Sequence, residues 1–104
     1  MTSDAEALAK FAEHQAWCDT LRARFSAVLP RPCDISVGPG WRGLVEAICE
    51  QLQAESERGQ GLPAVRQIKQ KFGALRVYLH VTPASAADSR FDALIDFAER
   101  LSTR

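Results

Sequence analysis

The side chains able to do chemistry are few and widely spaced in this sequence. Its two histidines are His14 and His80. A catalytic nucleophile needs an adjacent base, and that base needs an orienting group, but no such set is recognisable around either histidine. His14 falls on an apolar helical stripe, which indicates a core position, whereas His80 alternates with Tyr78 on the outer side of a predicted strand. We predict that the protein is not an enzyme. The alternative that stays open is an enzyme of unrecognised type that uses Tyr78 and His80.

The three cysteines, Cys18, Cys33 and Cys49, do not form a recognisable metal or disulfide set. Their number is odd and no two have the C-x-x-C spacing. Cys18 and Cys49 lie on apolar faces of predicted helices, where a free cysteine acts as a small hydrophobic residue. Cys33 follows Pro32 in a predicted loop, where its thiol could be exposed or buried. No cationic side chain is visibly arranged to activate that thiol. We predict no metal and no cofactor.

Two other patterns are weak signals of a site. Gly38-Pro39-Gly40 precedes a helix, and helix N-termini bind anions, but the phosphate-loop pattern G-x-x-x-x-G-K-[ST] is missing. A turn that seats Trp41 in the core explains this segment better. Acidic residues recur at helical spacing near the C-terminus and predict a solvated face: Asp88, Asp92, Asp96 and Glu99.

Positive charge gathers in one segment, although the formal net charge is zero. Residues 61–82 contain no acid and four bases, while residues 1–60 contain nine acids and six bases. A basic segment of this kind indicates a surface for phosphates or for an acidic protein. A strand edge kept soluble by its lysines is the alternative interpretation. The candidate binding surface comprises Arg66, Lys69, Lys71, Arg76, Tyr78 and His80.

Length and composition are those of one ordinary globular domain, residues 1–104. Hydrophobic residues make up 46% and charged residues 25% of the chain. No apolar run approaches the roughly 18 residues of a membrane span, and the first residues lack the basic start of a secretory signal. We therefore expect a soluble, cytoplasmic protein that does not enter a membrane.

Hydrophobic periodicity predicts two helices in the first half of the chain. The first runs from about Asp4 to Leu29, ends before Pro30, and presents one apolar stripe: Phe11, His14, Cys18, Leu21, Phe25 and Val28. The second runs from about Trp41 to Ser56 with a broad apolar face and a C-cap at Gly59. Between them, a short extended piece is expected at Asp34–Val37.

A β-hairpin and a third helix follow. Val65–Phe72 and Leu75–Thr82 are the predicted strands, with the turn at Gly73-Ala74. The second strand alternates strictly and buries Leu75, Val77, Leu79 and Val81. In the first strand, Ile68 and Phe72 share a face with Arg66 and Gln70. A last helix, capped by Ser85 or Asp88, runs to about Ser102.

These elements define an α+β fold of helix-helix-strand-strand-helix order, with an antiparallel β-hairpin packed against helices. A two-stranded hairpin alone is marginal in water. A third strand from Asp34–Val37, or pairing of the exposed hairpin edge across a dimer, would support it. The oligomeric state stays open between monomer and homodimer.

Two stretches of the sequence form a distinctive pattern. The first is Gly40-Trp41 with Leu44, Cys49 and Leu52, and the second is Gln67-Ile68-Lys69-Gln70-Lys71-Phe72-Gly73-Ala74-Leu75-Arg76-Val77-Tyr78. Together they resemble a family of short bacterial and phage proteins without an established activity. The resemblance covers about residues 38–101 and implies that the hairpin is a unit. It also implies a following Cys-x-x-Cys-Gly segment able to bind zinc, but these 104 residues hold none, so no metal role carries over.

The sequence favours a non-catalytic binding or regulatory module that engages a protein partner. An inhibitor or an immunity-type protein fits this description. The alternative is a nucleic-acid-binding protein that uses Lys69, Lys71, Arg76 and Tyr78. Zero net charge gives little long-range steering toward a polyanion, so a protein partner is favoured.

Overall fold

The computed structural model describes residues 3–31, 33–58, 61–82 and 89–103 of the chain. The caps predicted at Gly59 and at Ser85 or Asp88 lie outside these residues. The elements follow in the order α1 (Asp4–Arg24), β1 (Asp34–Ser36), the short 3-10 helix η1 (Pro39–Trp41), α2 (Arg42–Glu57), β2 (Leu62–Lys71), β3 (Ala74–Thr82) and α3 (Ser89–Leu101).

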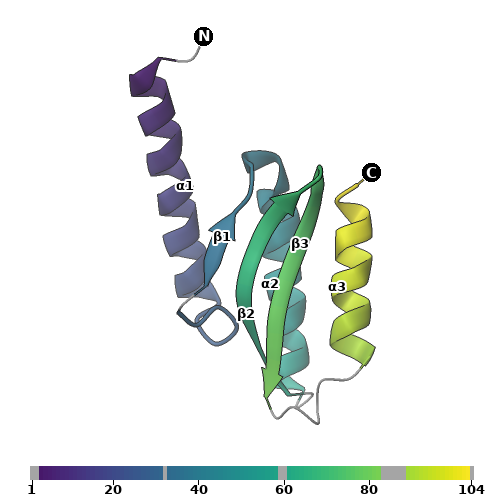
Figure 1. Cartoon of the computed structure of the whole chain (residues 1–104). Coiled ribbons are helices and arrows are strands. Elements are labelled where there is room, and N and C mark those ends of the chain that lie inside the picture. The colour runs from purple at the N-terminus through teal and green to yellow at the C-terminus, as the bar shows by residue number, and fades with distance from the viewer. Residues whose placement is uncertain (1–2, 32, 59–60, 83–88, 104) are drawn as a thin grey trace.

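The strands form a three-stranded sheet in the order β1-β2-β3. β2 and β3 are the predicted antiparallel hairpin, and β1 adds a parallel strand with Ile35 opposite Ile68. The α+β fold is thus confirmed, and the extended piece expected at Asp34–Val37 supplies a third strand. Figure 1 shows α2 behind the sheet and α3 beside β3, so the opposite face of the sheet is open.

The core lies between the inner face of the sheet and the helices. Leu75, Val77 and Val81 of β3 are buried, as their alternation predicts, and Leu79 is half-buried against them. Removing such side chains from water is the main stabilising term in a fold of this size. The helices contribute the other side of this core: Cys18, Leu21, Val45, Ile48, Cys49, Leu52, Phe91 and Ala98. Trp41, at the end of η1, is half-buried and packs against the cluster as expected.

The face pattern predicted for β2 is wrong at Arg66. The register shifts between Val65 and Gln67, so one extra residue enters the strand at this point. A bulge of this kind moves the following residues to the other face. Val65 and Ile68 are therefore both buried, while Arg66 is exposed.

The first helix ends earlier than its pattern predicts. α1 stops at Arg24, and turns carry the chain through Phe25 to Leu29. Val28 remains buried, but its carbonyl oxygen accepts a hydrogen bond of 2.8 Å from the amide of Val65 in β2. A longer helix would leave this carbonyl without a partner, because the residue four positions on, Pro32, has no amide hydrogen. The bond to the sheet therefore satisfies a buried backbone group.

Among the described residues, the C-terminal half of α1 makes hydrogen bonds to other elements. The Trp17 indole donates to Glu46 of α2 at 2.8 Å, and Arg22 donates to the Cys33 carbonyl at 2.7 Å. Residues 3–13, which we call the arm, are all exposed and extend beyond the body in Figure 1. Phe11 lies on the arm and is 60% exposed, so its predicted place on the buried stripe is wrong.

Among the described residues, no helix combines the length and the apolar character that a membrane crossing requires.

Candidate functional site

The turn of the hairpin consists of Phe72 and Gly73, one residue earlier than predicted. Lys71 pairs with Ala74, and the two residues between them have φ angles of 53° and 74°. Positive φ at both positions is the type I′ turn, whose twist matches that of the flanking strands. Phenylalanine is rarely found at positive φ, which explains why the sequence pattern points to Gly73-Ala74 instead.

Phe72 is the feature of this site that the sequence interpretation missed. Its side chain is 93% exposed at the hairpin tip, not on a shared face with the buried Ile68. The Lys71 ammonium lies 5.6 Å from the centre of its ring. In the sequence, this position at a turn is indicated by its two neighbours, Lys71 and Gly73.

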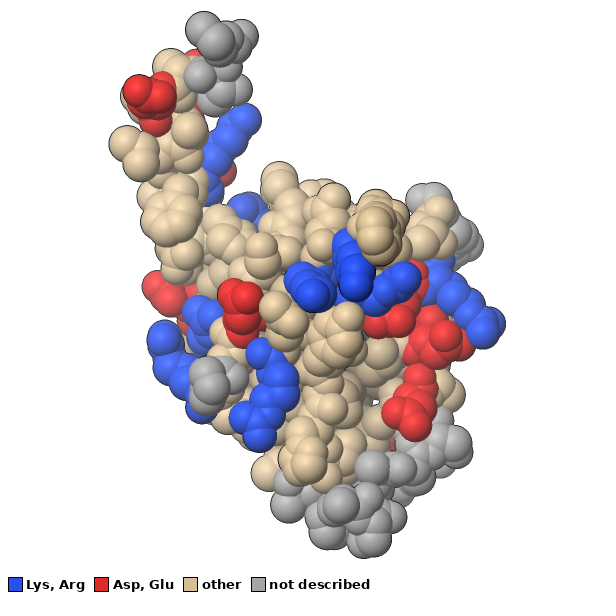
Figure 2. Space-filling view, viewed as in Figure 1, with Lys and Arg blue, Asp and Glu red and all other residues tan. Residues whose placement is uncertain are grey.

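Four of the six predicted surface residues lie on the open face between the turn and the middle of β3. Lys69 lies opposite Arg76, and its ammonium is 5.5 Å from the centre of the Tyr78 ring. Figure 2 shows the lysine and arginine side chains side by side over β2 and β3, below the turn. With the exposed aromatic residue they form one surface, which we call the tip patch: Lys69, Lys71, Phe72, Arg76 and Tyr78.

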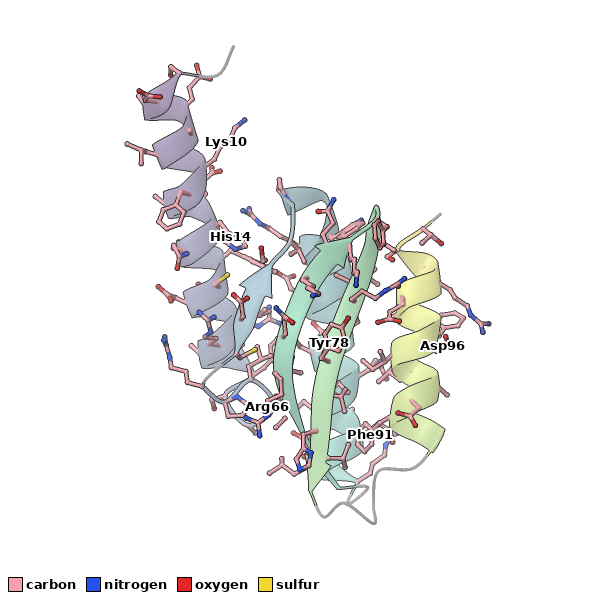
Figure 3. All side chains as sticks on the ribbon, in the orientation of Figure 1. Lys10, His14, Arg66, Tyr78, Phe91 and Asp96 are labelled. Atoms are coloured by element: carbon pink, nitrogen blue, oxygen red, sulfur yellow. The ribbon has the colours of Figure 1, made fainter. Side chains whose placement is uncertain are left out.

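The other two predicted residues lie farther from the turn. Arg66 is at the bulge, and Figure 3 shows it well below Tyr78 on the same face of the sheet. His80 is exposed and pairs with Ala64, farther from the turn than Tyr78. The predicted surface thus runs along the open face from the tip toward the far end of β3, with Arg66 at the bulge and His80 farthest from the turn.

Glu99 modifies the charge of the tip patch. Its Oε1 lies 3.8 Å from Arg76 Nη1, and its Oε2 accepts a hydrogen bond of 3.0 Å from the Val77 amide. The prediction that Glu99 belongs to a solvated face is therefore wrong, whereas Asp92 and Asp96 are exposed as expected. Because this ion pair partly offsets Arg76, Lys69 and Lys71 supply most of the positive charge.

α3 also covers the free edge of β3, which bears on how this chain associates. Besides the bond from Val77 to Glu99, the Leu75 amide donates to Ser102 Oγ at 2.9 Å. These side chains occupy backbone groups that a neighbouring strand would otherwise use. Dimerisation through an exposed hairpin edge is therefore not supported along this part of β3.

His14 connects α1 to β1. Its Nε2 lies 3.0 Å from the carbonyl oxygen of Ile35 and 3.4 Å from Cys18 Sγ. Because a carbonyl oxygen only accepts, Nε2 carries a proton and donates it. The half-buried position agrees with the predicted core role. Beside it, an open hollow of about 530 Å³ extends to the tip, lined by His14, Ser36, Val37, Gly38, Gln70, Phe72 and Gly73.

The three thiols are buried, including that of Cys33, which the sequence left open to exposure. Burial raises the pKa of the Cys18 and Cys33 thiols and, with nearby acidic groups, raises the pKa of Cys49 to about 12. These thiols are protonated near neutral pH, and a protonated thiol is a poor nucleophile. Within the described ranges, no three metal-ligating side chains come together.

Comparisons with protein-family models, curated proteins and solved structures find no match to this chain. The resemblance to a bacterial and phage family therefore stays a prediction from the sequence.

Proposed function

We propose that this chain is a non-catalytic binding module that engages a protein partner through the tip patch. Phe72 is the observation that carries this proposal. Its ring is 93% exposed and its backbone has a φ of 53°. A bulky residue in the left-handed region costs roughly 1–2 kcal/mol, and such strain concentrates at functional sites. An anchor that enters a pocket of the partner accounts for both features.

The surroundings of Phe72 support a protein interface. Binding energy at interfaces concentrates in a few aromatic and arginine side chains, ringed by weaker polar contacts. The tip patch has this composition, with Tyr78 and Arg76 on the sheet and Lys69 and Lys71 beside the ring. The positive charge favours an acidic surface on the partner. Inhibition of an acidic target, as by an immunity-type protein, falls within this proposal.

Affinity capture from the native host tests the proposal with a matched pair of variants. The test variant combines Phe72→Asn, Lys69→Glu and Lys71→Glu, and the control is Arg31→Glu at an exposed site outside the sheet. We expect the wild type and the control to recover one shared protein, and the test variant to recover it about tenfold less or not at all. Equal recovery by the test variant would show that the tip patch is not the binding surface.

Phe72→Asn alone provides an independent test of the anchor. Asparagine tolerates positive φ better than phenylalanine, so we expect the free energy of unfolding in urea to rise by about 0.5–1 kcal/mol. Partner recovery should fall in the same variant, which is the signature of a side chain kept for binding at a cost in stability. A fall in stability would instead indicate that the ring supports the fold.

Nucleic-acid binding is the second candidate, because Phe72 and Tyr78 each lie near a lysine and present rings on which bases could stack. Fluorescence anisotropy with labelled single-stranded DNA and RNA separates the two functions. This candidate requires binding that weakens steeply with salt and is lost in Lys69→Glu/Lys71→Glu. Absence of binding at low salt eliminates it.

A further inference from the structure

The arm presents an apolar surface that no part of the described chain covers. Leu8 is 69% exposed and Phe11 is 60% exposed. Residues three positions apart lie on one side of a helix, so these two side chains form a single apolar ridge. Helices of this length are marginal in water without tertiary packing. The arm therefore has the properties of a segment that packs against another surface.

A separate apolar groove lies between α2 and α3. It has a volume of about 290 Å³, and Phe97 on its rim is 63% exposed. Apart from Gln51, its wall consists of apolar residues. The residues that shape it most are Leu44, Ala47 and Ile48 of α2, and Leu94, Phe97 and Leu101 of α3.

We propose that two copies of this chain associate by exchanging arms, with Leu8 and Phe11 of each copy seated in the α2–α3 groove of the other. Each chain supplies one ridge and one groove, so a reciprocal pair covers both features on both copies. Such a pair is a closed twofold dimer. The tip patch takes no part in it, so this inference stands independently of the proposed function.

The dimensions of the two features agree. The groove is lined by residues 44–51 of α2 and 94–101 of α3. Seven residue steps of helix span about 10 Å at 1.5 Å per residue. Leu8 and Phe11 are about 4.5 Å apart along their axis by the same measure, which leaves room for both side chains within the groove.

Charge does not oppose this pairing. The arm carries the acids Asp4, Glu6 and Glu13 against the single base Lys10. The groove begins beside the N-terminal turn of α2, which contains no acidic residue and carries the positive end of the helix dipole. At the same end, Arg100 is 78% exposed in its side chain but is paired with Asp96 at 2.8 Å, and the C-terminus of α3 carries the negative end of its own helix dipole. The acidic arm therefore meets no strong repulsion at this end of the groove.

The apolar area fits a reversible dimer. An aromatic side chain buries about 150–250 Å² when fully covered, so Leu8, Phe11 and Phe97 together leave roughly 350 Å² to cover. A reciprocal pair doubles this to about 700 Å², and the flanking groove residues add to it. Stable complexes bury about 1,200–2,000 Å². We therefore expect a dimer that dissociates on dilution.

Cysteine pairing between different variants tests the arrangement directly, since the native thiols are buried. Leu8→Cys protein is mixed with Phe97→Cys protein under mild oxidation. We expect a disulfide-linked dimer that contains one chain of each kind, and little linkage in either variant alone. The control pair, Leu8→Cys with Leu62→Cys, places the second thiol on β2 and reports random collision, because Leu62 is also exposed.

Light scattering on the unlinked protein gives the second readout. The wild type should have the mass of two copies at submillimolar concentration and of one copy on dilution, while Phe11→Glu and Phe97→Glu should each stay monomeric. Both substitutions are at exposed positions, so circular dichroism should show an unchanged fold. Efficient linkage of Leu8→Cys to itself, of Phe97→Cys to itself, or a wild type monomeric at every concentration would overturn the proposal. Open polymers would overturn its reciprocal form.

Discussion

The protonation state of a side chain in this protein depends on its surroundings in the fold. Cys49 is the clearest example, because it is completely buried on α2 and its thiol has a pKa raised from 9.0 to about 12, mainly by burial. Burial disfavours the charged thiolate, and the nearby Glu46 and Glu50 add to this effect. The state of this residue is therefore a property of the folded protein and not of cysteine itself.

This shift predicts a loss of stability at high pH. Between about pH 9 and pH 12, the unfolded chain releases the Cys49 proton and the folded chain retains it. The stabilising contribution is thus complete below pH 9 and declines by up to about 1.4 kcal/mol per pH unit above it. Urea unfolding at several pH values measures this slope.

Cys49→Ala provides the comparison for this prediction. It removes the titrating group, so its stability should fall less steeply than that of the wild type above pH 9. Other groups that titrate in this range affect both proteins alike. Parallel slopes would show that the Cys49 thiolate is not excluded from the folded state.

At the scale of elements, α3 acts as an edge cover for the sheet as well as a layer over the core. Glu99 and Ser102 accept hydrogen bonds from two backbone amides of β3, Val77 and Leu75. Ser102 is itself buried at 9% exposure, so its hydroxyl is shielded from water. An unpaired buried amide costs about 1–3 kcal/mol, which makes this contact a substantial part of the packing between α3 and β3.

Two neighbouring hydroxyls test the edge cover. Ser102→Ala leaves the Leu75 amide without its acceptor, and we expect a loss of about 1–3 kcal/mol in urea unfolding together with faster hydrogen exchange at that amide. Thr103→Ala removes an exposed hydroxyl that donates to the Arg100 carbonyl within its own turn, so its effect should stay within about 0.5 kcal/mol. Equal effects of the two substitutions would contradict this account of α3.

In the molecule as a whole, the arm differs from the rest of the chain, which we call the body, because the body is held together by core packing and the arm is exposed. The molecule measures 49 × 29 × 18 Å, and the arm lies at one extreme of its length. Core contacts begin only where α1 reaches β1, near His14, which Figure 3 shows directed toward the body. One helix thus contains both a part packed into the core and an exposed part.

Two leucines of α1 measure this difference. Leu21 is 1% exposed and Leu8 is 69% exposed. Leu21→Ala should lower the free energy of unfolding by about 2–5 kcal/mol through lost burial and a cavity. Leu8→Ala should change it by no more than about 0.5 kcal/mol in dilute protein. A large loss in Leu8→Ala under those conditions would show that the arm packs against its own chain.

Much of the architecture follows from local patterns. Strict alternation in Leu75–Val81 predicts both the strand and its buried face, and three-to-four spacing predicts all three helices, because each pattern reflects the geometry of one element. Such patterns predict the boundaries less well, as at the C-terminus of α1, where turns replace the helix expected through Phe25–Leu29.

The candidate site is only partly accessible to such reasoning. The charge run of residues 61–82 correctly identifies the hairpin as the basic element, and four of its predicted residues lie together. The bulge at Arg66 and the turn at Phe72 depend on pairing between β2 and β3, and a one-residue shift of register changes which face a side chain occupies. The central residue of the tip patch was therefore missed.

Local sequence patterns predict the fold class, the hairpin with its buried face, and the concentration of positive charge there. The pairing of β1 with β2, the exposure of Phe72 at the tip and the cover of α3 over the edge of β3 became visible in the folded chain. The tertiary structure also decided that Phe11 and Leu21, on one helix, have opposite environments. The physical reason is common to these cases. The periodicity of a sequence shows which side of a helix or strand is apolar. Whether that side is buried depends on which distant parts of the chain pack against it.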